Sequence, residues 1–247
     1  GGLLIAYTNV GICFLINFLC ILPNVFLVKM MRIKDEKPKD VKNGKILDGL
    51  KEGFEYTFKH PPIFVSQLFL AIFCFVLLSY PMLMPIYTSE VLHDNADTLG
   101  FIMGATGVGS LTATLLLAMK TTTRCLRRIL FFGCAAISIV YILIGFIHSE
   151  ILVILLMFVA GLGMECFLAP QNMLLQNIVS NKIRGRVMSV NALCYMGTIS
   201  LSSYVSGLIA EYLGVTHTFA ILGSVMLVLG CYFSYRLSKF DYNTKIE

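Results

Sequence analysis

The sequence contains few charged residues. Only 13% of its 247 residues are Asp, Glu, Lys or Arg, whereas 57% are hydrophobic, and the mean hydropathy is +0.81. Because soluble domains contain about 25% charged and about 45–50% apolar residues, this composition excludes an ordinary soluble domain. The apolar residues come in runs of about 17–25, long enough for a helix to cross a hydrocarbon core of about 30 Å. We therefore expect a protein that crosses the membrane several times.

No segment shows the strict alternation of apolar and polar residues that a membrane-spanning β-barrel needs. The hydropathy pattern instead predicts seven membrane-spanning segments, which are residues 12–28, 63–87, 99–119, 129–147, 151–175, 187–213 and 219–233. Each is expected to be a helix, because lipid cannot satisfy exposed backbone N–H and C=O groups. Residues 1–10 are too short to span and lack both an initial Met and a signal-peptide pattern. They predict the end of an earlier helix, so we expect the chain to be a fragment of a longer protein.

Basic residues are absent from every second loop. Nine Lys or Arg residues fall within 29–59, four within 120–128, three within 182–186 and three within 236–245, which accounts for all 19. The loops around residues 90–97, 148–150 and 211–217 contain none. Because basic loops remain cytoplasmic, this pattern predicts a protein of the cytoplasmic membrane whose C-terminus faces the cytoplasm.

Groups suited to metal binding or catalysis are scarce. None of the eight cysteines lies in a predicted outer loop, so the sequence implies no disulfide framework. His60, His93, His148 and His217 lack Cys or carboxylate partners at the spacing of a metal site, and no glycine-rich phosphate loop is present. We expect no metal, no cofactor, no enzymatic activity and no nucleic-acid partner. A membrane enzyme and a seven-helix receptor are the weaker alternatives.

The longest polar stretch follows the first apolar segment. Within it, residues 46–60 place Leu47, Leu50, Phe54 and Phe58 three or four positions apart, which predicts one apolar stripe on a helix. Pro61-Pro62 ends this helix. We expect a short amphipathic helix on the inner membrane surface, as a connector between two bundles rather than a lipid sensor.

Several motifs along the chain resemble those of one transporter family. They are residues 48–54 (DGLKEGF), His60-Pro61-Pro62, 85–92 (PIYTSEVL), 99–101 (LGF), 107–110 (GVGS), 169–172 (APQN), Gln176 and 184–189 (RGRVMS). Together with the helix order, these motifs resemble the C-terminal part of a major facilitator superfamily transporter, in the branch of drug and siderophore exporters that includes macrolide efflux pumps and enterobactin exporters. The segment 120–128 (KTTTRCLRR) departs from the family, since it lacks the acidic residue and glycines of the corresponding loop motif.

The resemblance implies an all-α major facilitator fold of twelve helices. Residues 1–30 would end the N-terminal bundle, 31–62 would form the cytoplasmic central loop, 63–237 the C-terminal six-helix bundle and 238–247 the cytoplasmic tail. The implied function is proton-coupled efflux of a small molecule by alternating access, in a protein that is monomeric at full length and contacts membrane lipid. A nutrient importer of the same superfamily is the alternative, because a fold does not fix the direction of transport.

Glu165 is the only carboxylate in the interior of a predicted apolar helix, since the others lie in loops or at helix ends. An ionised carboxylate there costs at least about 2.5–3.5 kcal/mol unless water or a partner reaches it. Asn172 and Gln176 follow at seven and eleven residues, so the three polar side chains share one face of the helix. This stripe predicts a site of proton coupling or cation recognition, with a structural interhelical hydrogen bond as the alternative.

Two further groups are candidates. Tyr80 and Met84 lie beside Pro81 and Pro85, where an adaptable pocket or an ordinary kinked helix is expected. The motif Arg184-Gly185-Arg186 predicts either a gating latch, with Gly185 in a tight turn and the arginines paired with helix ends or inner-loop carboxylates, or a topology signal alone.

Other residues predict helix packing. Gln67, Asn17 and Asn191 are expected to form interhelical hydrogen bonds, and Gly100-x-x-x-Gly104, Ser203-x-x-x-Gly207, Gly161 and Gly163 close helix contacts.

Overall fold

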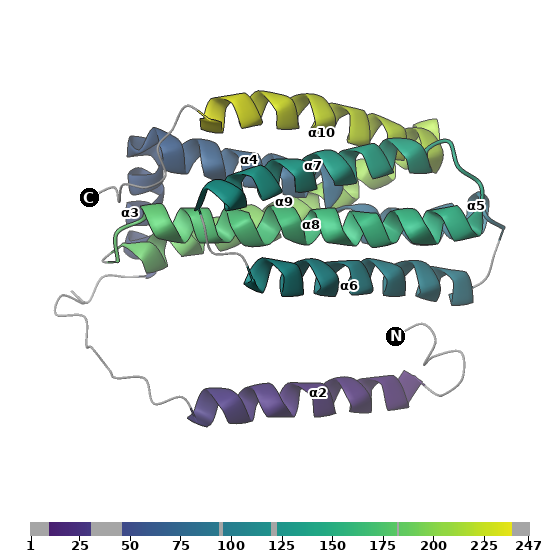
Figure 1. Cartoon of the computed structure of the whole chain (residues 1–247), viewed down its shortest axis with the longest axis horizontal. Coiled ribbons are helices and arrows are strands. Elements are labelled where there is room, and N and C mark those ends of the chain that lie inside the picture. The colour runs from purple at the N-terminus through teal and green to yellow at the C-terminus, as the bar shows by residue number, and fades with distance from the viewer. Residues whose placement is uncertain (1–9, 31–45, 94–95, 120–122, 182, 239–247) are drawn as a thin grey trace.

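The computed structural model describes residues 10–30, 46–93, 96–119, 123–181 and 183–238 (Figure 1). Its elements are the helices α2 (Val10–Met30), α3 (Ile46–Lys59), α4 (Pro61–Leu77), α5 (Tyr80–Glu90), α6 (Ala96–Ala118), α7 (Thr123–Ile144), α8 (Glu150–Ile178), α9 (Arg184–Leu213) and α10 (Val215–Ser238). These ranges contain no strand, so the predicted all-α fold is confirmed. Residues 1–9 of the predicted stub, 31–45 of the predicted central loop and 239–247 of the predicted tail lie outside the described residues.

Six described helical stretches are long and apolar enough to cross a membrane. They are Pro61–Glu90, Asp97–Ala118, Cys125–Ile144, Glu150–Ile178, Arg184–Leu213 and Val215–Leu237. Each corresponds to one of the last six segments that hydropathy predicts. The stretch Phe14–Met30 of α2 is apolar but shorter, and its side chains are exposed, because α2 lies apart from the other helices (Figure 1).

Consecutive spans run in opposite directions through the bundle (Figure 1). The starts of α4, α7 and α9 and the ends of α6, α8 and α10 therefore lie together, beside α3. Each of the four basic segments of the sequence adjoins at least one of these helix ends. The opposite end of the bundle carries the loops that contain no Lys or Arg, so the fold separates the charges as strongly as the loop count predicts.

A break at Leu78 and Ser79 divides the second apolar segment into α4 and α5. Pro81 causes it, because a proline has no N–H to donate to the carbonyl four residues earlier. That carbonyl belongs to Leu77, and it accepts a hydrogen bond from the Tyr141 hydroxyl of α7 instead. The Leu77 carbonyl is therefore paired despite the bend, as the membrane interior requires.

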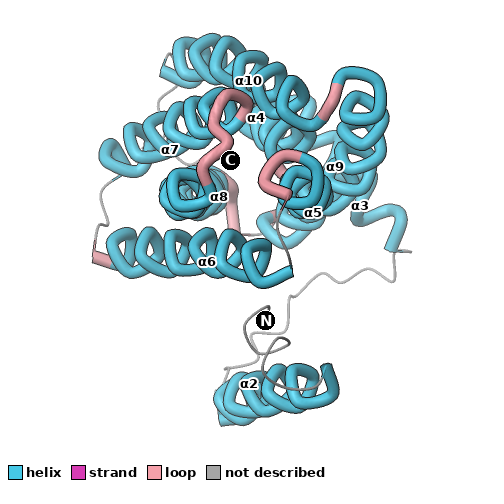
Figure 2. Tube along the Cα trace, turned by 90° about the vertical axis from the view of Figure 1, so that its right-hand side faces the viewer, coloured by secondary structure: helices cyan, strands magenta, loops and turns pink. Residues whose placement is uncertain are grey.

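Helix α8 lies between α6 and α7 in the end-on view of Figure 2. Glycines allow its close approach to both neighbours. A Cβ atom built on Gly161 would overlap the Thr106 carbonyl oxygen of α6, and one on Gly163 would lie 2.8 Å from the Gly133 carbonyl oxygen of α7. The predicted packing role of Gly161 and Gly163 is therefore present in the structure. An aromatic cluster fills the core beside α8, where the rings of Phe73 and Phe167 stack at 3.7 Å.

Candidate transport site

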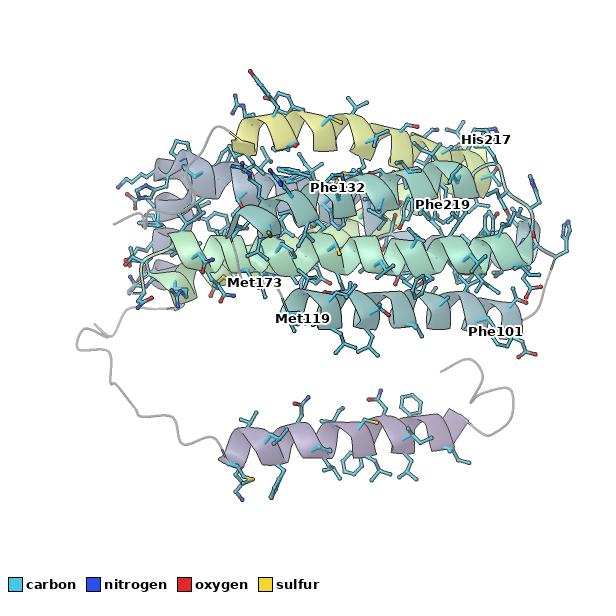
Figure 3. The ribbon with its side chains drawn as sticks, in the orientation of Figure 1. Phe101, Met119, Phe132, Met173, His217 and Phe219 are labelled. Atoms are coloured by element: carbon cyan, nitrogen blue, oxygen red, sulfur yellow. The ribbon has the colours of Figure 1, made fainter. Side chains whose placement is uncertain are left out.

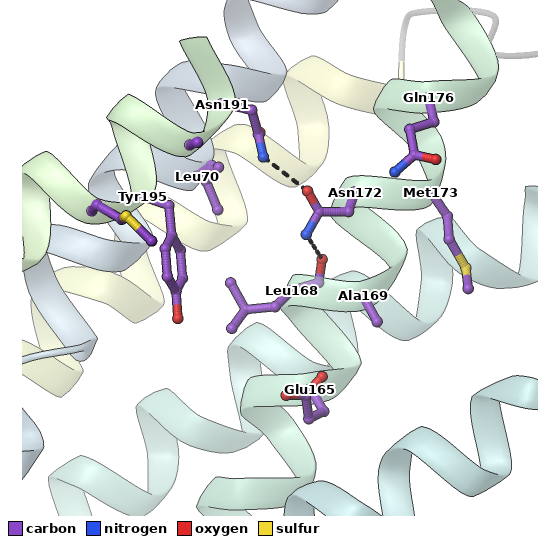
Figure 4. Close-up of a pocket in the computed structure, with 11 residues that line it drawn as sticks. Leu70, Glu165, Leu168, Ala169, Asn172, Met173, Gln176, Asn191 and Tyr195 are labelled. Carbon is purple, nitrogen blue, oxygen red and sulfur yellow. Dashed lines mark hydrogen bonds between the residues drawn. The ribbon is translucent and has the colours of Figure 1, made fainter. Parts of the chain in front are cut away.

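The polar stripe of α8 opens into a cavity of about 600 Å³ between α4, α8 and α9. Glu165, Asn172 and Gln176 all line it (Figure 4). Their helical spacing explains this arrangement, because residues seven and eleven positions apart return to nearly the same side of a helix. A cavity of this volume lies within the range of about 300–1,000 Å³ that is typical of small-molecule sites.

Two asparagines join the walls of the cavity. The Asn191 side-chain amide of α9 donates a hydrogen bond to the Asn172 oxygen of α8 at 2.8 Å. The Asn172 amide in turn donates to the Leu168 carbonyl at 3.1 Å (Figure 4). Asn191 therefore forms the interhelical bond expected of it, and it fixes the orientation of Asn172. The side-chain amide of Asn172 therefore has a fixed position in the wall of the cavity.

The Glu165 carboxylate makes no hydrogen bond or ion pair with any residue that the structure describes. Its side chain is half-buried, one helical turn before Leu168. The interhelical hydrogen bond that would make Glu165 a structural residue is thus missing from the described part of the chain. Around the cavity, Glu165 is the only ionisable carboxyl group in the described lining, and no Lys or Arg lies there. Glu165 therefore needs water or a cationic ligand to stabilise its charge, or a proton to neutralise it.

The remaining lining residues were not predicted from the sequence. They are Leu70 of α4, Leu168, Ala169 and Met173 of α8, and Asn191, Ala192, Tyr195 and Met196 of α9. Tyr195 brings an aromatic ring and a hydroxyl opposite α8 (Figure 4), and the two methionines bring flexible apolar surface. The spacing of residues within α9 does not predict which of them line the cavity. Only the packing of α9 against α4 and α8 determines which face of α9 lines it.

Tyr80 and Met84 do not belong to this cavity. Met84 has no exposed surface and lies in the hydrophobic core, while Tyr80 is partly buried and packs against the same core. Both residues lie on α5, beyond the break after α4. The structure therefore separates them from the α8 stripe with which the sequence grouped them as candidates.

The motif Arg184-Gly185-Arg186 lies in the first turn of α9. Arg186 forms an ion pair with Glu52 of α3, which is one of the pairings expected from the sequence. The tight turn expected at Gly185 is wrong, because α9 already begins at Arg184 and Gly185 has no positive φ. A Cβ atom built on Gly185 would meet nothing within 4 Å, whereas a Cβ atom built on Gly53 of α3 would lie 2.6 Å from the Arg186 carbonyl oxygen. Gly53 is thus the glycine that brings α3 and α9 together.

Charge on α3 is balanced locally. Lys59 donates a hydrogen bond to Glu55 one turn earlier, at 2.8 Å. This hydrogen bond and the positive charge of Lys59 lower the pKa of Glu55. Elsewhere in the described residues, no three His, Cys, Asp or Glu side chains gather in a way that could hold a metal ion.

The sequence of residues 1–245 matches the family described as transmembrane secretion effectors, of the major facilitator superfamily. The chain belongs to this family. Its resemblance to drug and siderophore exporters of this superfamily and its polytopic all-α architecture are thereby confirmed.

Two curated relatives share the assignment. The chain is 24% identical to the staphyloferrin A transporter of Staphylococcus aureus (strain NCTC 8325 / PS 47) over 246 residues, covering 96% of this chain and 59% of that protein. It is 26% identical to the uncharacterized MFS-type transporter YfmI of Bacillus subtilis (strain 168) over 149 residues, covering 59% of this chain and 36% of that protein. The chain thus spans about three fifths of the first relative and about a third of the second.

Proposed function

We propose that the full-length protein exports siderophore-type or drug-type small molecules, including macrolide-like ones, across the cytoplasmic membrane in exchange for protons. One relative carries the name of a siderophore transporter, which supports the first substrate class. The observation that carries the proposal is the Glu165 carboxyl group in the cavity of α4, α8 and α9, where it has no partner among the described residues. One carboxyl group in a cavity whose described lining holds no other charged side chain couples proton binding to the state of that cavity.

The coupling follows from the cost of enclosing a charge. When the second half of the transporter closes over the cavity and excludes water, an ionised Glu165 loses its stabilisation. Closure is therefore favourable only when Glu165 has bound a proton or faces a positively charged group of the substrate. Since proton and cation compete for one carboxylate, each would leave as the other binds, and this competition produces exchange.

The charge of the lining also bears on the substrate. No basic side chain lies among the described lining residues, so this half of the transporter suits neutral or cationic parts of a ligand. An anionic siderophore would need basic residues from the other half. Asn172, Gln176 and Tyr195 supply hydrogen bonds for polar groups, and Met173 and Met196 supply adaptable apolar contacts.

In the full-length protein, α4 to α10 would form the C-terminal bundle of residues 63–237. Helix α2 would belong to the N-terminal bundle, which would account for its exposed apolar side chains. Residues 31–62, with α3, would be the central cytoplasmic loop, and 238–247 the cytoplasmic tail. Alternating access then consists of one bundle rocking against the other around the central cavity. The Arg186–Glu52 pair would tie α3 to one bundle during this motion.

The orientation has its own test. In a full-length background without native cysteines, single cysteines at Asn95 and Thr216 are expected to react with an impermeant thiol reagent added to intact cells. Cysteines at Asn43 and Thr123 are expected to react only after the membrane is opened, because the basic loops remain inside. The opposite labelling pattern would contradict the orientation.

Direction and coupling are tested with the purified full-length protein in liposomes. An imposed pH gradient is expected to drive accumulation of substrate on the acidic side, as proton exchange requires. The substrates are a cationic dye, a macrolide and a carboxylate siderophore, each measured with the gradient in both directions and with none. Accumulation on the alkaline side would instead show cotransport with protons and support the importer alternative. Transport whose rate and direction do not change with the pH gradient would contradict proton coupling.

A further inference from the structure

A second cavity lies on different helices from the transport site. It is a groove of about 280 Å³ between α7 and α10. Its lining includes Arg128, Phe131, Phe132 and Ala135 of α7 and Gly230 and Cys231 of α10. Phe132 (Figure 3) is 75% exposed, so the groove opens on the outer surface of the bundle. Neither α7 nor α10 contributes a residue to the cavity that contains Glu165.

The packing of the two helices creates the groove. Near one end, a Cβ atom on Gly145, the residue that follows α7, would lie 2.8 Å from the Thr216 carbonyl oxygen of α10. Further along, one on Gly223 of α10 would lie 2.6 Å from the Ser138 carbonyl oxygen. At Gly230 the nearest atom is instead a side-chain sulfur, that of Cys134, at 3.0 Å. The backbones thus touch along most of the contact and separate toward the end where Arg128 lies.

Three arginines surround this open end, and one of them, Arg236, lies over the ring of Tyr232. Arg128 lines the groove and Arg127 precedes it, while Arg236 occupies the last turn of α10. None of the three forms an ion pair with a carboxylate in the described part of the chain. Helices α7 and α10 contain no Asp or Glu at all. The site therefore joins an apolar slot, open toward the lipid, to a guanidinium group at the level of the membrane surface.

We propose that this groove binds one anionic phospholipid, with an acyl chain in the slot and the headgroup phosphate on Arg128. A planar guanidinium group recognises a phosphate through two parallel hydrogen bonds, and basic sites between membrane helices on the cytoplasmic side favour anionic headgroups. The slot is smaller than the cavities of about 300–1,000 Å³ that bind drug-sized ligands. Apart from Arg128 and Ser234 its lining is apolar, which suits hydrocarbon. The inference does not depend on the proposed transport reaction.

The test measures lipid binding to the purified full-length protein by native mass spectrometry. Phosphatidylglycerol and phosphatidylcholine with identical acyl chains are titrated, and soluble glycerol 3-phosphate is added as a competitor. Arg128→Gln is expected to lower the apparent affinity for phosphatidylglycerol about tenfold or more, because it removes the charge-assisted hydrogen bonds from the guanidinium group to the headgroup phosphate. Its affinity for phosphatidylcholine should stay within about twofold, and millimolar glycerol 3-phosphate should not displace the lipid, since the acyl chain supplies much of the binding.

Two further variants complete the design. Ala135→Phe fills the slot from a half-buried position and is expected to weaken the binding of both lipids. Arg127→Gln removes the same charge outside the lining, so it should change the affinity for either lipid by no more than about twofold. Equal losses from Arg127→Gln and Arg128→Gln would reduce the site to general surface charge and overturn the proposal. Unchanged binding by Arg128→Gln would also overturn it. So would displacement by glycerol 3-phosphate alone, or a change of oligomeric state in Ala135→Phe, which would identify a second protein copy as the occupant.

Discussion

Substitution of valine for Gly161 is expected to prevent the full-length protein from packing α6 against α8. A Cβ atom at this position overlaps the Thr106 carbonyl oxygen and lies 2.9 Å from its carbonyl carbon. Both are backbone atoms, so no side-chain rotation relieves the overlap and the two helices must separate. Overpacking of this kind costs about 1–3 kcal/mol or more. We expect the unfolding midpoint of the detergent-solubilised protein to fall by roughly 5–10 °C.

Gly104 of α6 provides the matched control, because a Cβ atom there meets nothing within 4 Å. Alanine is favoured over glycine in a helix by about 1 kcal/mol. Gly104→Ala is therefore expected to leave the midpoint unchanged or raised, whereas Gly161→Ala should lower it despite the same change in helix propensity. Equal midpoints for the two alanine variants, measured by thermal-shift size-exclusion chromatography, would show that α6 and α8 do not approach as described.

The sequence predicts the helices well because each membrane span must satisfy its backbone groups within itself. Hydropathy alone therefore locates the six described spans, and the charge count agrees with the way their ends gather. The prolines at 81 and 85 signal a bend, but its consequence requires the structure. Only the fold shows that the Tyr141 hydroxyl, 60 residues away from Pro81, pairs with the freed Leu77 carbonyl.

Contacts between helices were predicted less well. Gly161 and Gly163 pack closely as expected, but Gly104 faces open space, while Gly109, five residues later, meets the Phe158 backbone. A spacing of four residues places two glycines on one face without saying which face meets a neighbour. For Gln67, too, the sequence does not show which neighbour its side chain meets. An interhelical hydrogen bond was expected, but its buried amide has no hydrogen-bond partner in the described residues.

The sequence predicted the α8 side of the candidate site but not its α9 side. The stripe on α8 follows from helical periodicity within one segment, so Glu165, Asn172 and Gln176 could be grouped from the sequence. The α9 wall depends on the rotation of that helix, which exposes polar and apolar residues on several sides and has no single marked face. Tyr195 therefore carried no signal, and Tyr80 was placed with the site only because aromatic residues beside prolines often line pockets.

Glu165→Gln in the full-length protein is expected to lower gradient-driven transport by about tenfold or more, given the several kcal/mol that separate a charged from a neutral carboxyl group in the membrane. Glutamine keeps the size and polarity of the side chain but neither binds nor releases a proton at these pH values. Closure of the cavity then no longer depends on whether a proton or a cation is bound at position 165, so the pH gradient no longer drives exchange. Substrate-for-substrate exchange without a gradient is expected to stay within about twofold, because it requires no net proton movement.

Glu150→Gln provides the control, since it makes the same atomic change in the first turn of the same helix, where Glu150 accepts a hydrogen bond from Thr98 at 3.1 Å. It should leave both assays unchanged, and Glu165→Asp should retain part of the gradient-driven rate with a shifted pH dependence. If Glu165 only binds a cationic substrate, Glu165→Gln will weaken the exchange of cations but spare neutral molecules. Gradient-driven transport at the normal rate by Glu165→Gln would eliminate the coupling role, and the proton site would then have to lie in the other half of the transporter.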